Sequence, residues 1–272
     1  MAAQTHRVVV VGGTGKMGRE VVKTVLQAPD MDLVGVCDRH HVGEDAALAI
    51  GLPTPAQVPI ETDLNALLAR VQADVCVEFT RPESVKANAL CLVAHGVRPV
   101  IGTTGLTTED LVTLQQALAQ QGLAGAVIPN FAIGAVLLMQ FAQKASQYFT
   151  HAEIVELHHN KKLDAPSGTA LRTASLMAEA SADGFAVTNV ADTESIAGAR
   201  GAQGPAGLRI HSVRLPGLVA HQEVLFGASG ELFTLRHDSF DRQCFMPGVA
   251  LACRRLMQEP AGQLVLGLEH WL

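Results

Sequence analysis

The chain has 272 residues, enough for one large domain or two modest ones. Hydrophobic residues make up 48% of it and charged residues 17%, which is typical of a compact α/β protein and excludes a disordered one. The formal net charge is −6 without a long basic run, which argues against nucleic acid as the main partner. The five scattered cysteines never form Cys-x-x-Cys, which favours reduced thiols in a cytoplasmic compartment over disulfides or a zinc site.

The sequence also predicts no membrane partner. The chain begins without the pattern of a signal peptide and soon enters a β-branched run. One long uncharged run, 122–143, is interrupted by Pro129, Asn130 and Gly134, so a strand, a loop and a helix explain it better than a membrane span.

A glycine-rich loop opens the first domain. The β-branched run 6–11 predicts a strand, and 19–27 has a helical pattern. Between them, Gly13, Gly15 and Gly18 satisfy the Gly-x-Gly-x-x-Gly spacing, which allows a tight turn and close approach to a pyrophosphate. A turn that only packs a helix on a strand is the alternative interpretation.

An acidic residue at the end of the next predicted strand, 33–37, supports dinucleotide binding. Asp38 is placed to bind the ribose hydroxyls of NAD, while Arg39 is suited to the 2′-phosphate of NADP. The sequence therefore predicts NADPH and/or NADH as the cofactor and leaves the preference open.

Strands and helices continue to alternate, as a Rossmann-like doubly wound parallel sheet requires. The loop 102–105 follows a predicted strand, at the edge where such sheets bind ligands. Strands are expected at 74–79, 97–101 and 123–128, and helices begin after Thr80, at Thr107 and near Ile133, the last running to Phe149.

After residue 150 the pattern changes to a second α+β domain. A strand at 152–158 and a helix at 167–180 are followed by a polar loop at 181–205. Pro216-Gly217 and 227–230 predict hairpins in an open mixed or antiparallel sheet, whose apolar free face would bind other copies of the chain. Its other strands are expected at 208–214, 218–226 and 231–237, before a closing helix at 243–258.

The stretch 156–170 concentrates chemically useful side chains. His158 and His159 suit proton transfer near neutral pH, and Lys162 can anchor a carboxylate or donate a proton. Gly168 and Thr169 offer backbone N–H groups at a helix N-terminus, where anions bind. This combination predicts a site for a small unsaturated acid that takes a hydride at one atom and a proton at another.

Each of these features also has a structural explanation. Adjacent histidines on a strand point to opposite sides, two lysines often form a solvated face, and Ser-Gly-Thr often only caps a helix. Their occurrence within twelve residues beside a cofactor domain favours a site. His158 and His159 lack metal-ligand spacing, so no metal is expected.

These residues closely resemble the signature of the 4-hydroxy-tetrahydrodipicolinate reductase family of the diaminopimelate and lysine pathway. Other segments of the chain resemble the family in the same order, namely 12–18, 79–83, 100–105, Asn130-Phe131 and 219–223. The resemblance implies a dinucleotide-binding domain over 1–130 and 241–272. It implies a substrate-binding and oligomerisation domain over 131–240, a homotetramer, and NAD(P)H-dependent reduction of a cyclic dicarboxylate with loss of its 4-hydroxyl as water.

The resemblance also implies roles for individual residues. His158 would be the proton donor or acceptor, and Lys162 a second proton donor or a carboxylate anchor. His159, Gly168 and Thr169 would bind the substrate. The cofactor would contact Gly12, Gly13, Thr14, Gly15, Lys16, Met17, Asp38, Arg39, Arg81, Gly102, Thr103, Thr104, Ile128, Pro129, Asn130 and Phe131, with Arg242 nearby.

Two segments depart from the family pattern. Ala132 and Val136 stand where the family usually has polar residues, which affects hydrogen bonding beside the cofactor domain. The loop 191–207 matches poorly, and no role is assigned to it.

Two rival functions share the first domain. One is a nicotinamide dehydrogenase for another small acid, such as an amino-acid semialdehyde, and the other is a redox-sensing module that binds NAD(P) without turnover. The first does not need the 162–169 loop, and the second does not need His158 and Lys162 together.

Overall fold

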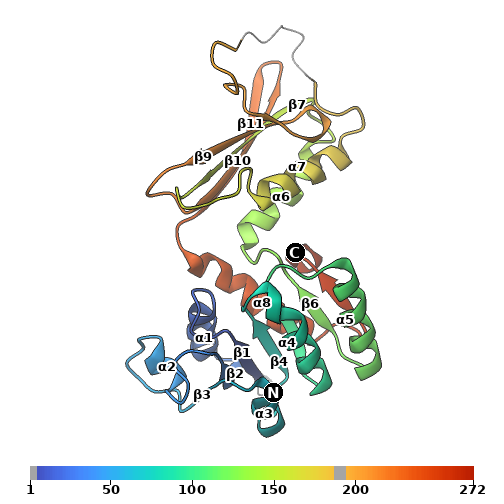
Figure 1. Ribbon diagram of the computed structural model, residues 1–272. Helices are drawn as coiled ribbons and strands as arrows, with labels where there is room; N and C mark the ends of the chain where they lie inside the picture. Colours follow the sequence, from blue (N-terminus) through green and yellow to red (C-terminus); the bar gives the residue numbers. More distant parts are fainter. Residues whose placement is uncertain (1–4, 187–193) are drawn as a thin grey trace. The chain divides into compact units, whose positions relative to one another are not determined.

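The chain forms two compact units, which Figure 1 shows in a computed structural model that describes residues 5–186 and 194–272. Unit 1 comprises Met1–Ala132 and Phe245–Leu272, and unit 2 comprises Ile133–Cys244. Unit 1 is thus assembled from both ends of the chain, with unit 2 inserted into it.

Unit 1 contains a seven-stranded parallel sheet in the order β12-β6-β5-β4-β1-β2-β3. The direction of strand order reverses between β1 and β4, so the carboxyl ends of these strands flank a topological switch point. The elements are β1 (His6–Val11), α1 (Gly18–Gln27), β2 (Met31–Cys37), α2 (Ala46–Ala49), β3 (Ile60–Glu61), α3 (Leu64–Arg70), β4 (Val75–Glu78), α4 (Pro82–Ala94), β5 (Arg98–Ile101), α5 (Thr108–Gln121), β6 (Gly125–Val127), α8 (Met246–Leu256), β12 (Leu264–Leu266) and η3 (Leu268–Trp271).

The central strands of unit 1 are hydrophobic because helices cover both faces of the sheet. Helices α1 and α8 contact each other and the sheet, while α3, α4 and α5 form a second neighbouring series. Val85, Ile101, Leu114 and Leu118 belong to one buried cluster that joins α4 and α5 to the sheet. The predicted Rossmann-like sheet is confirmed.

Two parts of the chain in and next to unit 1 differ from the prediction. The helix expected over 243–258 is confirmed as α8, but it begins only after the 3₁₀ turn η2 (Arg242–Phe245), and it does not close the chain, because β12 follows at the sheet edge. The elements α2, β3 and α3, between β2 and β4, were not predicted. A strand of two residues, such as β3, is too short to produce a hydrophobic period.

Unit 2 contains a five-stranded mixed sheet in the order β11-β10-β7-β9-β8. The long strand β7 lies at its centre, parallel to β9 and antiparallel to β10. The elements are α6 (Ile133–Ala145), β7 (His151–His158), α7 (Gly168–Ala180), β8 (Ala202–Gln203), η1 (Pro205–Gly207), β9 (Arg209–Arg214), β10 (Ala220–Ala228) and β11 (Glu231–Ser239).

One of the two predicted hairpins is wrong. The turn at Pro216-Gly217 connects β9 to β10, but β7 lies between these two strands, so they do not pair. Alternation of apolar residues locates a strand but does not say which strand is its neighbour. The β10–β11 hairpin is confirmed, with Gly230 at a positive φ of 83° in its turn.

Side chains of the unit 2 sheet alternate between a covered and an open face. Ile154, Val224 and Phe226 pack with Met177 of α7 in the core of this unit. The open face carries ion pairs among its apolar side chains, including Arg236–Glu223 and His211–Glu153. It is therefore mixed, and not the simply apolar face that was expected.

The segment between α7 and β9 was predicted as a loop. Residues 187–193 of it lie outside the described residues, and its end forms β8 and η1. Across residues 5–186 and 194–272, no helix combines the length and the apolar character that crossing a membrane requires.

Candidate functional site

The predicted cofactor residues follow the carboxyl ends of five neighbouring strands in unit 1. Because the strands are parallel, these ends meet at one edge of the sheet. Gly12, Gly13, Thr14, Gly15, Lys16 and Met17 follow β1; Asp38 and Arg39 follow β2; Arg81 follows β4; Gly102, Thr103 and Thr104 follow β5; and Ile128, Pro129, Asn130 and Phe131 follow β6. The edge brings them together, and their contact with a cofactor stays a prediction.

Two glycines of the first loop have no room for a side chain. Gly12 has a φ of +82°, and a Cβ there would overlap the carbonyl oxygen of Phe79. A Cβ on Gly18 would overlap the carbonyl oxygen of Gly12. These glycines thus allow the loop to pack against the end of β4 and against the start of α1.

Asp38 connects the glycine loop to the end of β2. Its carboxylate accepts hydrogen bonds from the backbone N–H groups of Thr14, at 2.9 Å, and His40, at 3.1 Å. Burial opposes ionisation of Asp38, but the backbone hydrogen bonds outweigh it and hold its pKa below 3.8. The carboxylate therefore stabilises the loop conformation, and its contact with a ribose stays a prediction.

Replacing Asp38 should weaken binding of both cofactors, NADH more than NADPH. In Asp38→Ala the N–H of Thr14 loses its acceptor, which disturbs the loop for either nucleotide, whereas a ribose hydroxyl contact is lost only for NADH. Titration of each cofactor by fluorescence measures the two dissociation constants. An equal loss of affinity for NADH and NADPH would contradict the predicted ribose contact. Asp38 would then only stabilise the loop.

The loops after β4, β5 and β6 are joined to one another. The side-chain oxygen of Thr103 accepts a hydrogen bond from the backbone N–H of Thr80 at 2.7 Å. The rings of Phe79 and Phe131 lie 5.5 Å apart between centroids. Arg81 is exposed at the N-cap position of α4, where its side chain makes no capping hydrogen bond, and Arg242 lies in η2.

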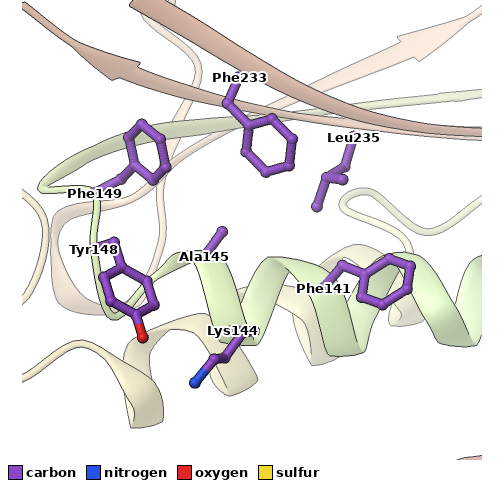
Figure 2. A pocket seen from close by; sticks show the side chains of 7 residues that line it. All are labelled: Phe141, Lys144, Ala145, Tyr148, Phe149, Phe233 and Leu235. Carbon is purple, nitrogen blue, oxygen red and sulfur yellow. The ribbon is translucent and has the colours of Figure 1, made fainter.

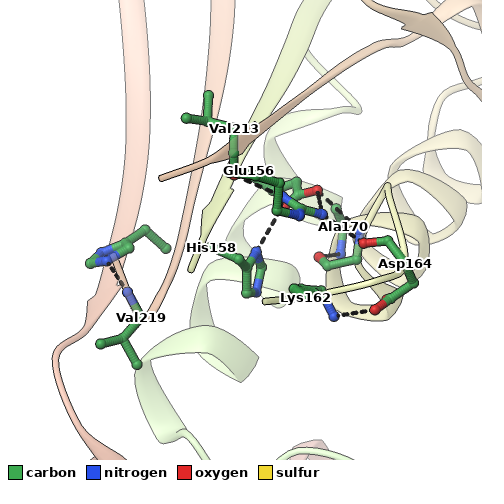
Figure 3. Close-up of polar contacts among 10 residues, drawn as sticks. Glu156, His158, Lys162, Asp164, Ala170, Val213 and Val219 are labelled. Atoms are coloured by element: carbon green, nitrogen blue, oxygen red, sulfur yellow. Dashed lines mark hydrogen bonds and ion pairs between the residues drawn. The ribbon is translucent and has the colours of Figure 1, made fainter. Parts of the chain in front are cut away.

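In unit 2, the residues predicted for proton transfer lie at the end of β7 (Figure 3). His158 has 14% of its side chain exposed, and its Nδ1 lies 2.5 Å from Oε2 of Glu156, whose side chain is fully buried. His159 lies just beyond the strand and is exposed. Of the two adjacent histidines, only His158 lies on the side of the strand that carries the buried carboxylate.

Glu156 also binds an arginine that comes from β9. Arg214 donates from its two terminal nitrogens to the two oxygens of Glu156, at 2.8 and 2.9 Å. Burial opposes ionisation of Glu156, yet hydrogen bonds from Arg214, Ser212 and His158 together lower its pKa below the usual 4.5. Glu156 is therefore a carboxylate at neutral pH.

The surroundings of His158 favour its neutral form. Burial is the largest cause, and the positive charges of Lys162 and Arg214 add to it, so the pKa of His158 falls below 6.5. Hydrogen bonding to Glu156 acts in the opposite direction but does not balance these effects.

The loop after β7 places Lys162 near His158. Nζ of Lys162 donates to Oδ1 of Asp164 at 2.8 Å, and only 21% of the Lys162 side chain is exposed. Arg214 donates to the backbone carbonyl of Asp164 at 2.7 Å, which links the loop to β9. Because Asp164 is exposed, solvent screens its ion pair with Lys162.

Helix α7 presents its N-terminus to the same region. Ser167 caps the helix, accepting a hydrogen bond from the N–H of Ala170 at 3.1 Å. The N–H groups of Gly168 and Thr169 precede it in the first turn, where helix geometry supplies no intrahelical acceptor. These two groups are suited to bind a carboxylate, and their contact with a substrate stays a prediction.

The helix cap at Ser167 is confirmed, but two polar residues of this region had no predicted role. Glu156 lies within the stretch 156–170, and Arg214 lies 58 residues beyond Glu156. The position of Glu156 on the covered face of the strand could have indicated such an ion pair. A buried carboxylate requires a cationic partner.

An apolar pocket in unit 2 is separate from this polar cluster. Figure 2 shows Ala145 of α6 pointing towards Phe233 of β11, with Phe149 and Leu235 on either side, while Lys144 points away from the strand; Phe141 and Tyr148 complete the lining. The polar groups of its lining side chains are the Tyr148 hydroxyl and the amine of Lys144, and this amine lies 5.5 Å from the centre of the Tyr148 ring. Among the described residues, no group of three or more potential metal ligands occurs.

The fold and the two sets of residues define an oxidoreductase with a Rossmann-like unit and a separate α+β unit. The family "dihydrodipicolinate reductase, N-terminus" matches residues 6–131, and "dihydrodipicolinate reductase, C-terminus" matches residues 134–272. The chain belongs to the dihydrodipicolinate reductase family. It is 52% identical to the 4-hydroxy-tetrahydrodipicolinate reductase of Nostoc sp., over 97% of each chain, and 50% identical to that of Mastigocladus laminosus, over all of each chain.

Solved structures agree with this assignment. Dipicolinate-bound dihydrodipicolinate reductase from Paenisporosarcina sp. TG-14 is 44% identical, with a TM-score of 0.87 over 99% of this chain and all of that one. An amine dehydrogenase from Mycobacterium smegmatis shares the fold, with a TM-score of 0.65 at 14% identity over 95% of this chain and 94% of that one. The family implies a nicotinamide cofactor.

Proposed function

We propose that this chain reduces 4-hydroxy-tetrahydrodipicolinate to tetrahydrodipicolinate with NADPH or NADH, in the diaminopimelate and lysine pathway. The observation that carries the proposal is the His158–Glu156 pair beside Lys162 and the N-terminus of α7. Relatives about 50% identical over nearly the whole chain are named for this activity, which supports the same assignment here.

In the proposed reaction, His158 and Lys162 divide the work of proton transfer and charge recognition. A bound reduced nicotinamide supplies a hydride, and the substrate's 4-hydroxyl leaves as water after it gains a proton. Nε2 of His158 is the site of the proton that the protein exchanges with the substrate. Lys162 and the N–H groups of Gly168 and Thr169 hold the substrate carboxylates, with His159 beside them.

A relative supports recognition of a cyclic dicarboxylate. The Paenisporosarcina enzyme binds dipicolinate, a planar ring with two carboxylates, and shares 44% of its sequence with this chain. We propose that unit 2 binds a ligand of this class, while unit 1 binds the cofactor along the carboxyl edge of its sheet.

A coupled assay tests the proposal. A synthase, pyruvate and aspartate semialdehyde generate the substrate in place, and oxidation of NADH and NADPH is followed separately. Oxidation that depends on this chain is expected, and the two rates rank the cofactors. Oxidation only with an amino-acid semialdehyde would favour the rival dehydrogenase, and cofactor binding without any turnover would favour the redox sensor.

Removing the charge of Lys162 should weaken dicarboxylate binding and change the pH dependence. Charge-assisted hydrogen bonds contribute ~1.5–3 kcal/mol, so Lys162→Met should raise KM and the dissociation constant of dipicolinate about 10- to 100-fold. Because Lys162 lowers the pKa of His158, the midpoint of the fall in kcat/KM with rising pH should move upward.

Lys161→Met is the matched control for this change. Lys161 is the exposed neighbour of Lys162, and we expect its replacement to leave both dipicolinate binding and the pH midpoint unchanged. An unchanged dipicolinate affinity in Lys162→Met would contradict the role as carboxylate anchor.

We also propose that the chain acts as a homotetramer in the cytoplasm. Unit 2 exposes large apolar side chains, among them Phe141, Tyr148 and Leu232, and such surfaces typically bind another chain. The free cysteines suit a reducing compartment. Light scattering should give four times the chain mass of 28.7 kDa, and a monomer mass would contradict the assembly.

A further inference from the structure

One buried carboxylate joins three separate segments of unit 2. Glu156 of β7 receives hydrogen bonds from Nδ1 of His158, from both terminal nitrogens of Arg214 and, at 3.3 Å, from the backbone N–H of Ser167 (Figure 3). Its side chain has no exposed surface. The strand with the histidine, the strand with the arginine and the start of α7 therefore all depend on this one group.

The chemistry of this carboxylate determines which nitrogen of His158 carries a proton. An ionised carboxylate only accepts hydrogen bonds, so Nδ1 must donate to Glu156. In the neutral ring Nε2 then holds the lone pair, and in the charged ring it holds the second proton. In either form, Nε2 is the nitrogen left to exchange a proton with a ligand.

We propose that Glu156 is a positioning residue that fixes the Nδ1–H form of His158 and directs Nε2 to the substrate. The inference rests on the proposed function, because His158 acts there as the proton donor. Arg214 neutralises the charge of Glu156 and, through the backbone carbonyl of Asp164, also holds the loop that carries Lys162.

Three charged groups act directly on the imidazole and a fourth acts through two of them, and together they set the expected pH response. Glu156 stabilises the protonated ring, while Lys162 and Arg214 destabilise it. Asp164 acts indirectly, because it is paired with Lys162 and bonded to Arg214. Loss of the charge on Glu156 should therefore lower the pKa of His158, whereas loss of the charge on Lys162 should raise it.

Nitrogen NMR of the wild-type protein provides the first test and does not depend on activity. With ¹⁵N-labelled histidine, the signal that disappears in His158→Gln belongs to His158. Near pH 8 it is expected to show a protonated Nδ1 and an unprotonated Nε2. The opposite pattern would overturn the proposal. Because this readout needs no substrate, it stays informative if the coupled assay fails.

Glu156→Gln provides the second test. Its neutral amide can donate as well as accept, so His158 should become a mixture of both tautomers, and its titration should move to lower pH. We expect kcat to fall ~10²-fold or more, as when the acid that orients a catalytic histidine is removed, with cofactor affinity unchanged. A His158 signal that keeps Nδ1–H in this variant would overturn the proposal, whatever the activity.

Two further variants complete the test. Glu153 lies on the same strand as Glu156 but on the opposite face of the sheet, where it contacts His211 and Arg200. Glu153→Gln should therefore leave kcat and the His158 signal unchanged. Glu156→Asp retains the charge and should restore the Nδ1–H form. If Glu156→Gln does not fold, the wild-type and Glu156→Asp spectra still decide, because an Nε2–H signal in either contradicts the proposed role.

Discussion

His158→Gln is expected to lower kcat by ~10²- to 10⁴-fold, the range that general acid–base residues contribute. Glutamine is similar in size and can still bond to Glu156, so the local packing should remain. It has no group that exchanges protons near neutral pH, so the proton that accompanies hydride transfer must come from water. KM and cofactor affinity should change much less, because Lys162 and the N-terminus of α7 are intact.

The rate loss in His158→Gln is measured with the coupled assay across pH, beside His151→Gln as the matched control. His151 lies at the opposite end of β7 and is exposed, so its replacement should leave turnover unchanged. In the wild type, kcat/KM should fall as pH rises through a midpoint below 6.5, because the pKa of His158 is lowered and the free ring must be protonated to act as a donor. In His158→Gln this dependence should vanish. Full turnover in the variant would remove His158 from the mechanism.

The fold of unit 1 was largely predictable because each of its long elements has its own period. Hydrophobic strands such as β1 and β4 contain continuous apolar runs in the sequence. The glycines of the loop between β1 and α1 have a characteristic spacing. The edge strand β3 was missed because two residues carry no period, and β12 was missed because it is defined by its pairing with β6.

The unit 2 site was predictable only in part, for a different physical reason. His158, Lys162 and the helix N-terminus are close in sequence, so their spacing reveals them. Arg214 reaches Glu156 because β9 pairs in parallel with β7, and this pairing depends on tertiary structure. The turn before β10 suggested a β9–β10 hairpin, which would have placed Arg214 elsewhere. Because β10 was predicted as the neighbour of β9 in place of β7, the pairing of Arg214 with Glu156 could not be predicted.

The second large effect is expected on stability, from replacing Arg214. Arg214→Met keeps the aliphatic part of the side chain but leaves the buried carboxylate of Glu156 without its cationic partner. Removing one member of a buried ion pair costs ~3–5 kcal/mol of unfolding free energy, because the remaining charge is poorly solvated. Asp164 also loses the hydrogen bond to its carbonyl, so the loop with Lys162 should loosen and substrate KM should rise.

The chain offers one natural probe for each unit in this measurement. Trp271 is the only tryptophan and lies in unit 1, while Tyr148 is the only tyrosine and lies in unit 2. In urea unfolding of Arg214→Met, the tyrosine signal should change at clearly lower urea, with a smaller shift of the tryptophan signal. Arg236→Met is the control, because Arg236 pairs with Glu223 and Asp238 at an exposed position where solvent screens the charges.

The double variant Glu156→Gln/Arg214→Met separates the charge effect from lost packing. With both charges removed, no buried ion is left unpaired, so the double variant should be more stable than Arg214→Met alone. Its turnover should nevertheless stay low, because His158 still lacks the carboxylate that orients it. If the two stability losses simply added, Arg214 would act through packing and not by neutralising Glu156. Recovered stability without recovered turnover is the result that assigns Arg214 to charge compensation and Glu156 to the orientation of His158.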